Sequence, residues 1–147
     1  MKIIEKFLQE TLQRKTRAAG VLHQDNMIFL VEERSQYGSL WSLPKWTGDM
    51  YTKPSELLLK GFKEELNINI IDYKSIVEKE TMQVIDQEEA FLKQVIFDVQ
   101  KYTGNPELKN KKRFSKFGWF TAHDISKLKK VTGITRMYLD VAKTKSF

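Results

Sequence analysis

Two adjacent glutamates on an amphipathic segment are the residues best suited to metal chemistry. Glu64 and Glu65 lie within residues 54–66, where apolar residues recur at helical spacing. Because position 61 lies about one turn earlier, side chains at positions 61, 64 and 65 would point in roughly the same direction. Three carboxylates there would hold a hard cation such as Mg²⁺. Position 61 is Gly61, so this helix supplies only two of the three.

Other carboxylates could complete such a site. Glu88 and Glu89 lie in a predicted turn, and Asp98 lies within the long strand that follows it. A carboxylate among apolar strand residues needs a partner, so we expect Asp98 to face the cleft. On spacing alone, the favoured alternative is a solvated helix face on which Lys60 pairs with Glu64, four residues later.

The helix must be positioned by the segments at its two ends. Pro54 suits a first helical turn, where a missing N–H costs nothing, and Asn67 suits the end, because Asn tolerates the left-handed conformation. Residues 41–53 are predicted to be the end of a strand followed by a loop. Trp46 and Tyr51 belong to this loop, where their rings could stack on a base or pack against the protein.

Strands dominate the rest of the predicted structure, on the basis of β-branched and aromatic runs between polar turns. Strands are expected over residues 17–23 and 26–33 (as a hairpin), 68–77 (one or two), 81–85, 91–102 and 114–121. Helices are expected over residues 122–129 and 134–143, and residues 2–13 fit a helix or the start of a strand. Because strands and helices do not alternate regularly, an α+β fold with a mixed sheet is favoured over a doubly wound parallel sheet.

Composition narrows the classes of protein and site. The chain has 147 residues, no cysteine and two histidines, which predicts one domain and argues against thiolate zinc or histidine-rich metal sites. Charged residues interrupt the apolar residues near the N-terminus, and no apolar run reaches membrane-spanning length. A cytoplasmic protein that does not enter a membrane is therefore expected.

The net charge of +6 and the pI of about 9.4 favour anionic partners such as nucleotides, phosphates or nucleic acid. The alternative is a basic surface that serves solubility alone. The densest basic cluster lies in a polar connection and can be a solvated loop or, with the nearby Phe114 and Phe117, a base-stacking surface. This cluster comprises Lys109, Lys111, Lys112, Arg113 and Lys116.

Residues 17–129 resemble a Nudix domain, the fold that hydrolyses nucleoside diphosphates linked to another group. Residues 41–44 (WSLP) match the lead-in to the Nudix signature, and the match continues from Pro44 to Ile68 without a gap. Residues 17–35 and 118–128 resemble the family's opening hairpin and closing element. The resemblance implies an α/β/α sandwich with a central mixed sheet, a loop–helix–loop signature and a C-terminal helix. It makes residues 1–147 one Nudix-like domain with a core over about 17–129.

Four signature positions depart from the family in ways that affect the site. The first glycine is Trp46, the isolated glutamate is Thr52, the arginine is Lys60, and the glutamate after it is Gly61. Lys60 keeps the positive charge but lacks the planar fork of arginine. If the loop follows the family's course, Trp46 would fill space near the phosphates and narrow or block the usual site.

The resemblance implies that the protein acts on, or binds, a nucleoside diphosphate linked to another group. Glu64 and Glu65 would be the catalytic residues and would hold Mg²⁺ or Mn²⁺, with Asp98, Glu88 or Glu89 recruited as further ligands. Without a glutamate at position 61, hydrolysis is expected to be weak or non-standard. The alternative is an inactive Nudix-fold module that binds a nucleotide, nucleic acid or protein, and a homodimer is left open. The predicted substrate-binding residues are Arg34, Trp46, Tyr51 and Lys60.

Overall fold

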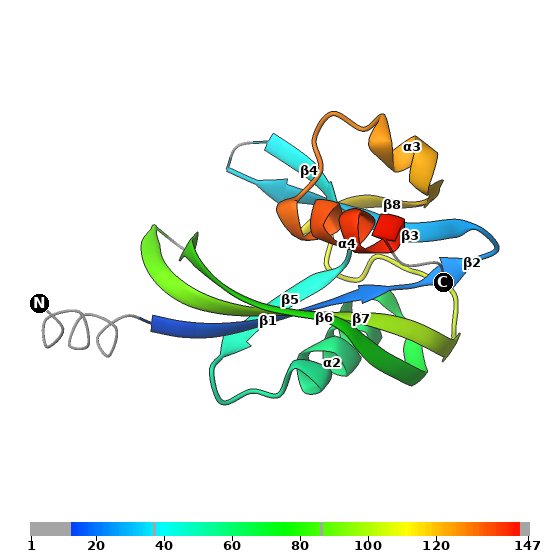
Figure 1. Ribbon diagram of the computed structural model, residues 1–147. Helices are drawn as coiled ribbons and strands as arrows, with labels where there is room; N and C mark the ends of the chain where they lie inside the picture. The colour runs from blue at the N-terminus through cyan, green and yellow to red at the C-terminus, as the bar shows by residue number, and fades with distance from the viewer. Residues whose placement is uncertain (1–12, 37, 86, 145–147) are drawn as a thin grey trace, which may run out of the picture.

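A mixed four-stranded sheet lies at the centre of the molecule (Figure 1). The structure is a computed structural model that describes residues 13–36, 38–85 and 87–144. The strand order is β5-β1-β7-β6; β1 and β7 run parallel, and the two outer pairs are antiparallel. The strands are β1 (Gln13–Val21), β5 (Lys45–Asp49), β6 (Asn69–Ile85) and β7 (Glu88–Thr103).

A second, antiparallel sheet lies beside the first. Its central strand, β3, pairs with β4 on one edge and with β8 on the other, and β2 pairs with the start of β3. The strands are β2 (His23–Gln24), β3 (Met27–Ser35), β4 (Gly38–Ser42) and β8 (Phe114–Thr121). The end of β3 and the residue before β8 lie next to the central sheet, where Glu33 and Arg113 contact Lys45 of β5.

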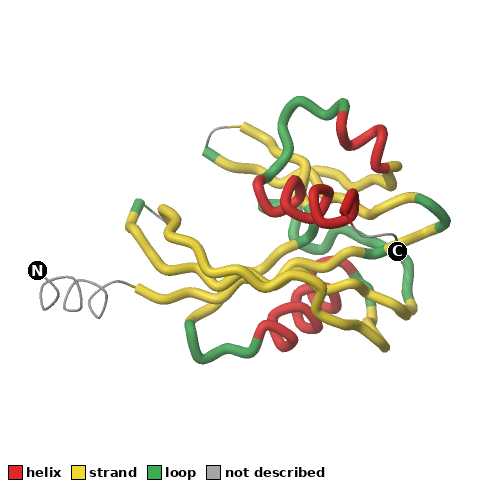
Figure 2. Tube along the Cα trace, viewed as in Figure 1, coloured by secondary structure: helices red, strands yellow, loops and turns green. Residues whose placement is uncertain are grey.

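Helices cover both faces of the central sheet. In Figures 1 and 2, α2 (Pro54–Leu66) lies on one side of it, while α4 (Gly133–Thr144) and the second sheet lie on the other. The short helix α3 (Ala122–Ser126) follows β8. This arrangement confirms the predicted α+β fold with a central mixed sheet. None of the helices in the described residues is long and apolar enough to span a membrane.

Alternation along the strands divides the core in two. Ala18 and Val95 belong to the core cluster that contains the buried face of α2, whereas Ala19 and Ile96 belong to the cluster that contains α4. Side chains of successive strand residues point to opposite faces of a sheet, so one pair of strands supplies both clusters. Gly20 allows α2 to approach closely, because a Cβ atom there would lie 2.4 Å from the ring of Phe62.

Several predicted elements are confirmed with small changes of boundary. The strand over 114–121 and the helix over 54–66 have the expected bounds, and Asn67 ends the helix with φ of 59°. The strand over 91–102 and the helix over 134–143 are each slightly longer than expected. Only residue 13 of the segment 2–13 belongs to the described residues, where it begins β1.

Three predictions of local structure were wrong. The expected hairpin is much shorter: β1 ends at Val21 in the central sheet, and only β2 (His23–Gln24) pairs with β3 across the turn. The chain changes sheets at the buried residue Leu22, whose carbonyl accepts a hydrogen bond from the Phe29 amide. The loop within 41–53 contains the strand β5, which pairs with β1. The strands expected over residues 68–77 and 81–85 are one continuous strand, β6, which starts at Asn69 and has register shifts near Asp72 and between Ser75 and Val77.

Candidate ligand-binding site

A cleft of about 520 Å³ lies between α2, the strands β1 and β5, and the connection before β8. Its walls are rich in charged side chains, with four basic residues and two acidic ones. It is lined by Lys15, Arg17, Trp46, Thr47, Leu57, Lys60, Gly61, Glu64, Glu65, Ile85 and Arg113.

Helix α2 packs one apolar face on the central sheet and forms one wall of the cleft with its polar face. Leu58, Phe62 and Leu66 are fully buried against the central sheet. Glu64 is exposed and Glu65 is half-buried, and both line the cleft. The amphipathic pattern predicted from the sequence therefore presents the glutamate pair at this wall.

The indole of Trp46 lies directly against the backbone of Gly61. A Cβ atom at position 61 would lie 2.1 Å from Cδ2 of Trp46 and 2.2 Å from its Cε2. The indole is further fixed by an edge-on contact with Phe62, with ring centroids 5.0 Å apart, and by a hydrogen bond from its Nε1 to a carboxylate oxygen of Glu65. The ring thus takes the space that a side chain at position 61 would need.

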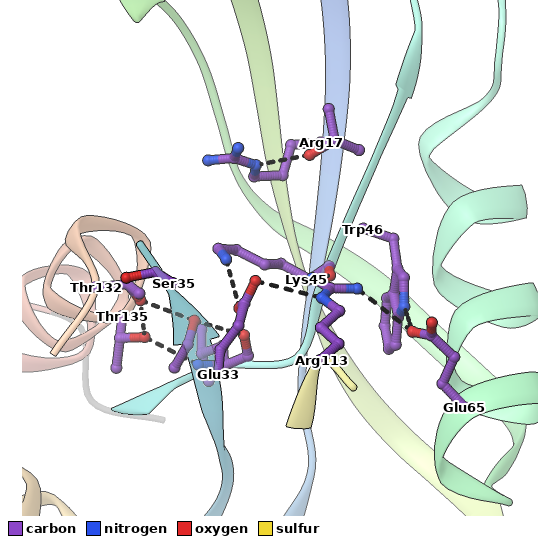
Figure 3. Close-up of polar contacts among 12 residues, drawn as sticks. Arg17, Glu33, Ser35, Lys45, Trp46, Glu65, Arg113, Thr132 and Thr135 are labelled. Atoms are coloured by element: carbon purple, nitrogen blue, oxygen red, sulfur yellow. Dashed lines mark hydrogen bonds and ion pairs between the residues drawn. The ribbon is translucent and has the colours of Figure 1, made fainter. Parts of the chain in front are cut away.

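Both carboxylate oxygens of Glu65 already accept hydrogen bonds within the protein. Oε1 accepts from Nδ2 of Asn110 at 2.7 Å. Oε2 accepts from the Trp46 indole and from Nη1 of Arg113, the latter at 3.3 Å. Figure 3 shows Trp46 and Arg113 converging on this carboxylate. Glu65 is therefore held as a structural acceptor.

Arg113 links Glu65 to a second carboxylate, Glu33 of β3 (Figure 3). Its Nε lies 3.3 Å from Oε1 of Glu33, and its Nη2 donates to the carbonyl of Lys45. The other oxygen of Glu33 accepts from Nζ of Lys45 at 2.6 Å. Four side chains that are distant in sequence thus form one chain of ion pairs, in which Glu65 and Arg113 line the cleft and Glu33 and Lys45 lie outside its lining.

Positive charge is in excess at this end of the cleft. Burial lowers the pKa of Lys45, and Glu33 only partly offsets this, while Arg17 and Arg113 lower it further. Burial also lowers the pKa of Arg17, opposed by Glu33 and reinforced by Arg113. Burial alone would raise the pKa of Glu33, but Lys45 and Arg113 outweigh it and hold that pKa below its ordinary value. Three cations that repel one another favour the binding of an anion.

The structure brings four of the predicted site residues together: Trp46, Lys60, Glu64 and Glu65 line the cleft. Asp98 does not belong to its lining. Its Oδ1 lies 2.6 Å from Nε2 of His23. We expected this carboxylate to face the cleft, and the structure corrects that expectation, because Asp98 pairs with a histidine outside the cleft lining.

The other predicted residues are also outside the set that lines the cleft. Glu88 and Glu89 are exposed at the start of β7. Arg34 lies at the exposed end of β3, where its Nε is 3.4 Å from the carbonyl of Lys111. Tyr51 is 85% exposed in the connection between β5 and α2, so its ring is free to contact a ligand but does not shape the cleft.

These carboxylates do not fit a divalent-metal site of the kind that the sequence resemblance implies. Position 61 offers no side-chain oxygen, and both oxygens of Glu65 are engaged by protein donors. Within residues 13–36, 38–85 and 87–144 there is no group of three or more His, Cys, Asp or Glu residues that could hold a metal ion. A cationic guanidinium lies between Glu33 and Glu65 instead.

Sequence reasoning missed the residues that complete the cleft. From sequence, Arg113 belongs to a basic cluster that fits a solvated loop or a base-stacking surface, and Arg17 and Glu33 fit strands, with nothing to mark Arg17 as a cleft residue or Glu33 as the partner of Arg113. The one available signal was the excess of basic residues between β7 and β8. No spacing rule connects Arg113 with Glu33, 80 positions earlier, because the pairing of β3 with β8 brings them together.

No protein-family model and no curated protein matches this sequence. Solved structures do match its fold. A MutT NUDIX hydrolase from Burkholderia pseudomallei is 19% identical, with 87% of this chain and 97% of that chain covered and a TM-score of 0.74. The NUDIX domain of Shewanella oneidensis NrtR, solved with ADP ribose, is 12% identical, with 91% and 88% covered and a TM-score of 0.69. A C. elegans Ap4A hydrolase is 12% identical, with 90% and 96% covered and a TM-score of 0.64. This chain therefore has the Nudix fold.

Proposed function

We propose that this protein binds a nucleoside diphosphate derivative in the cleft and does not hydrolyse it by the metal-dependent route. The observation that carries the proposal is the charge of the cleft. Arg17 and Arg113 line the cleft and interact with Lys45 next to it, while the nearby carboxylates of Glu33 and Glu65 are already paired. A bound diphosphate would relieve the repulsion among these cations through charge-assisted hydrogen bonds.

Arg17 is the side chain best placed to contact the phosphates. Its Nε donates to Oγ1 of Thr47 at 3.0 Å, which fixes the guanidinium at the cleft wall. A fixed, planar guanidinium suits bidentate recognition of phosphate. Lys15 and Lys60 line the same cleft and add positive charge.

The size of the cleft and the ligands of similar structures support a nucleotide. Its volume of about 520 Å³ is within the range of small-molecule sites. Of the similar structures, the Shewanella domain was solved with ADP ribose, and the C. elegans protein is described as an Ap4A hydrolase. ADP ribose and Ap4A are therefore the first ligands to test.

Hydrolysis would need groups that neutralise the phosphates and activate water, which bound metal ions supply when they are present. The predicted Mg²⁺ or Mn²⁺ would depend on Glu64 and Glu65. Glu65 is committed to Trp46, Asn110 and Arg113, which leaves Glu64 as the one uncommitted glutamate of the pair. We therefore expect binding without turnover.

A ligand screen tests this proposal. Thermal shift and chromatography of products would be measured with ADP ribose, Ap4A and nucleoside triphosphates, in EDTA and in Mg²⁺ or Mn²⁺. We expect binding in EDTA, no product, and at least about tenfold weaker binding by Arg17→Met. Arg136→Met, on α4 and outside the cleft, is the matched control. Turnover that is abolished by Glu65→Gln would support the hydrolase interpretation instead.

Nucleic acid is a second candidate ligand because exposed lysines lie beside the cleft. Lys109, Lys111 and Lys112 are exposed in the connection that also supplies Asn110 and Arg113. If they track a nucleic-acid backbone, single-stranded RNA should bind more tightly than a mononucleotide and with a steeper dependence on salt. Fluorescence anisotropy at several salt concentrations would measure this. The predicted homodimer stays a prediction, which sedimentation would check.

A further inference from the structure

We infer that the guanidinium of Arg113 occupies a cation site built from three oxygen atoms and thereby excludes divalent cations from the cleft. The oxygens come from three different elements. They are Oε1 of Glu33 in β3, Oε2 of Glu65 in α2 and the backbone carbonyl oxygen of Lys45 in β5. Each accepts from a different nitrogen of the same guanidinium.

With Arg113 in place these oxygens have no room for a metal ion, but without the guanidinium the same three oxygens would be of the kind that a metal ion binds. Carboxylate and carbonyl oxygens are the protein ligands that hard divalent cations prefer. Glu33 and Glu65 each lie 3.3 Å from the nearest guanidinium nitrogen, so both carboxylates face the same small space. The positive charge of Arg113 balances the negative charge of these two carboxylates, so no metal ion is needed to neutralise them.

Arg113 is held at this point from several directions. Its guanidinium carbon lies 4.7 Å from the ring centroid of Phe114 and 5.9 Å from that of Trp46. Its backbone carbonyl accepts from the amide of Arg34 at 2.8 Å, and its own amide donates to the carbonyl of Asn110 at 3.2 Å. Cation–π contact with aromatic rings favours a guanidinium, which is more weakly hydrated than a small cation. The side chain is thus part of the packed structure.

A divalent ion could enter only by displacing this side chain or by binding beside it. Repulsion between like charges a few ångströms apart, in a half-buried site, is strong enough to change affinity by more than about tenfold. Without Arg113, the two carboxylates and the Lys45 carbonyl would face a space with one positive charge fewer. We therefore expect a latent divalent-cation site that the wild-type chain keeps closed.

Mn²⁺ binding to purified protein tests this inference, with free Mn²⁺ followed by electron paramagnetic resonance. Arg113→Met removes the charge but keeps an apolar side chain that can pack on Phe114 and Trp46, and Arg113→Lys keeps the charge. Arg136→Met, on α4, is the matched control. We expect one Mn²⁺ per chain in Arg113→Met, bound at least about tenfold more tightly than by the other three proteins. Adding Glu65→Gln to Arg113→Met should abolish that gain.

Two results would overturn the inference. If wild-type protein binds Mn²⁺ as tightly as Arg113→Met, the arginine does not exclude the ion. If neither Arg113→Met nor the smaller, polar Arg113→Gln gains affinity, the three oxygens do not form a cation site. Testing both variants keeps the inference refutable if one of them fails to fold. Because Mn²⁺ alone is the probe, the outcome does not depend on which nucleotide fills the cleft.

Discussion

Substituting Gly61 with alanine should destabilise the protein, although the same change stabilises most helices. Within a helix, alanine is normally favoured over glycine by about 1 kcal/mol. At position 61 the added Cβ atom would lie 2.1 Å from Trp46. The indole must therefore shift to restore van der Waals contact, and a shift of that size strains the packing of the core around it.

The expected magnitude follows from the contacts of the indole. Overpacking of a core costs about 1 to 3 kcal/mol. Displacement of Trp46 also weakens its hydrogen bond to the charged Glu65, and bonds of that kind contribute about 1.5 to 3 kcal/mol. After the gain in helix propensity is subtracted, Gly61→Ala should lower the free energy of unfolding by about 1.5 to 5 kcal/mol.

Urea denaturation would measure the effect of Gly61→Ala in the wild type and in a Trp46→Leu background, with Gly133→Ala as the control. Gly133 at the start of α4 has no atom within 4 Å of an added Cβ, so Gly133→Ala is the matched control and should be neutral or slightly stabilising. In a Trp46→Leu background the sign should reverse, with Gly61→Ala stabilising by up to about 1 kcal/mol. If Gly61→Ala behaves like Gly133→Ala in the wild-type background, the reasoning about Trp46 is refuted.

Two further predictions concern the carboxylates of the cleft. Glu65→Gln should lower the free energy of unfolding by about 1 to 3 kcal/mol, because the Glu65 carboxylate accepts from three donors, whereas the exposed Glu64→Gln should stay within about 0.5 kcal/mol in the same denaturation assay. Burial alone would raise the pKa of Glu33, but Lys45 and Arg113 hold that pKa below its ordinary 4.5, so the stability that this carboxylate contributes is present above 4.5 and is lost as the pH falls through its folded-state pKa. Unfolding free energies between pH 7 and the acid range should therefore fall less steeply in Glu33→Gln than in the wild type, and equal slopes would contradict this assignment.

Much of the fold was predictable because its signals are local. The apolar stripe of α2, the proline in its first turn and the left-handed Asn67 at its end all lie within residues 54–67. The runs that became β7 and β8 are rich in β-branched and aromatic residues. By contrast, β5 is a short strand that is recognised by its pairing with β1. No pattern within residues 45–49 predicts that pairing.

The chemistry of the cleft was harder to predict because it depends on residues at distant positions that contact one another only in the folded chain. Trp46 and Gly61 each depart from the Nudix signature, and the sequence could show only that a carboxylate was missing and that a ring was added. Their contact explains both departures at once, since the ring lies where a side chain would otherwise stand. Arg113 joins them through tertiary pairing alone, so periodicity cannot reveal it.

The central claim is that the cleft binds its ligand with protein cations in place of metal ions. A pair of calorimetric titrations with ADP ribose, one in EDTA and one in Mg²⁺, tests this most directly when the contents of the cell are then analysed by chromatography. We expect the same affinity in both buffers and intact ADP ribose at the end. Binding that appears only with Mg²⁺, together with cleavage of the diphosphate, would contradict it.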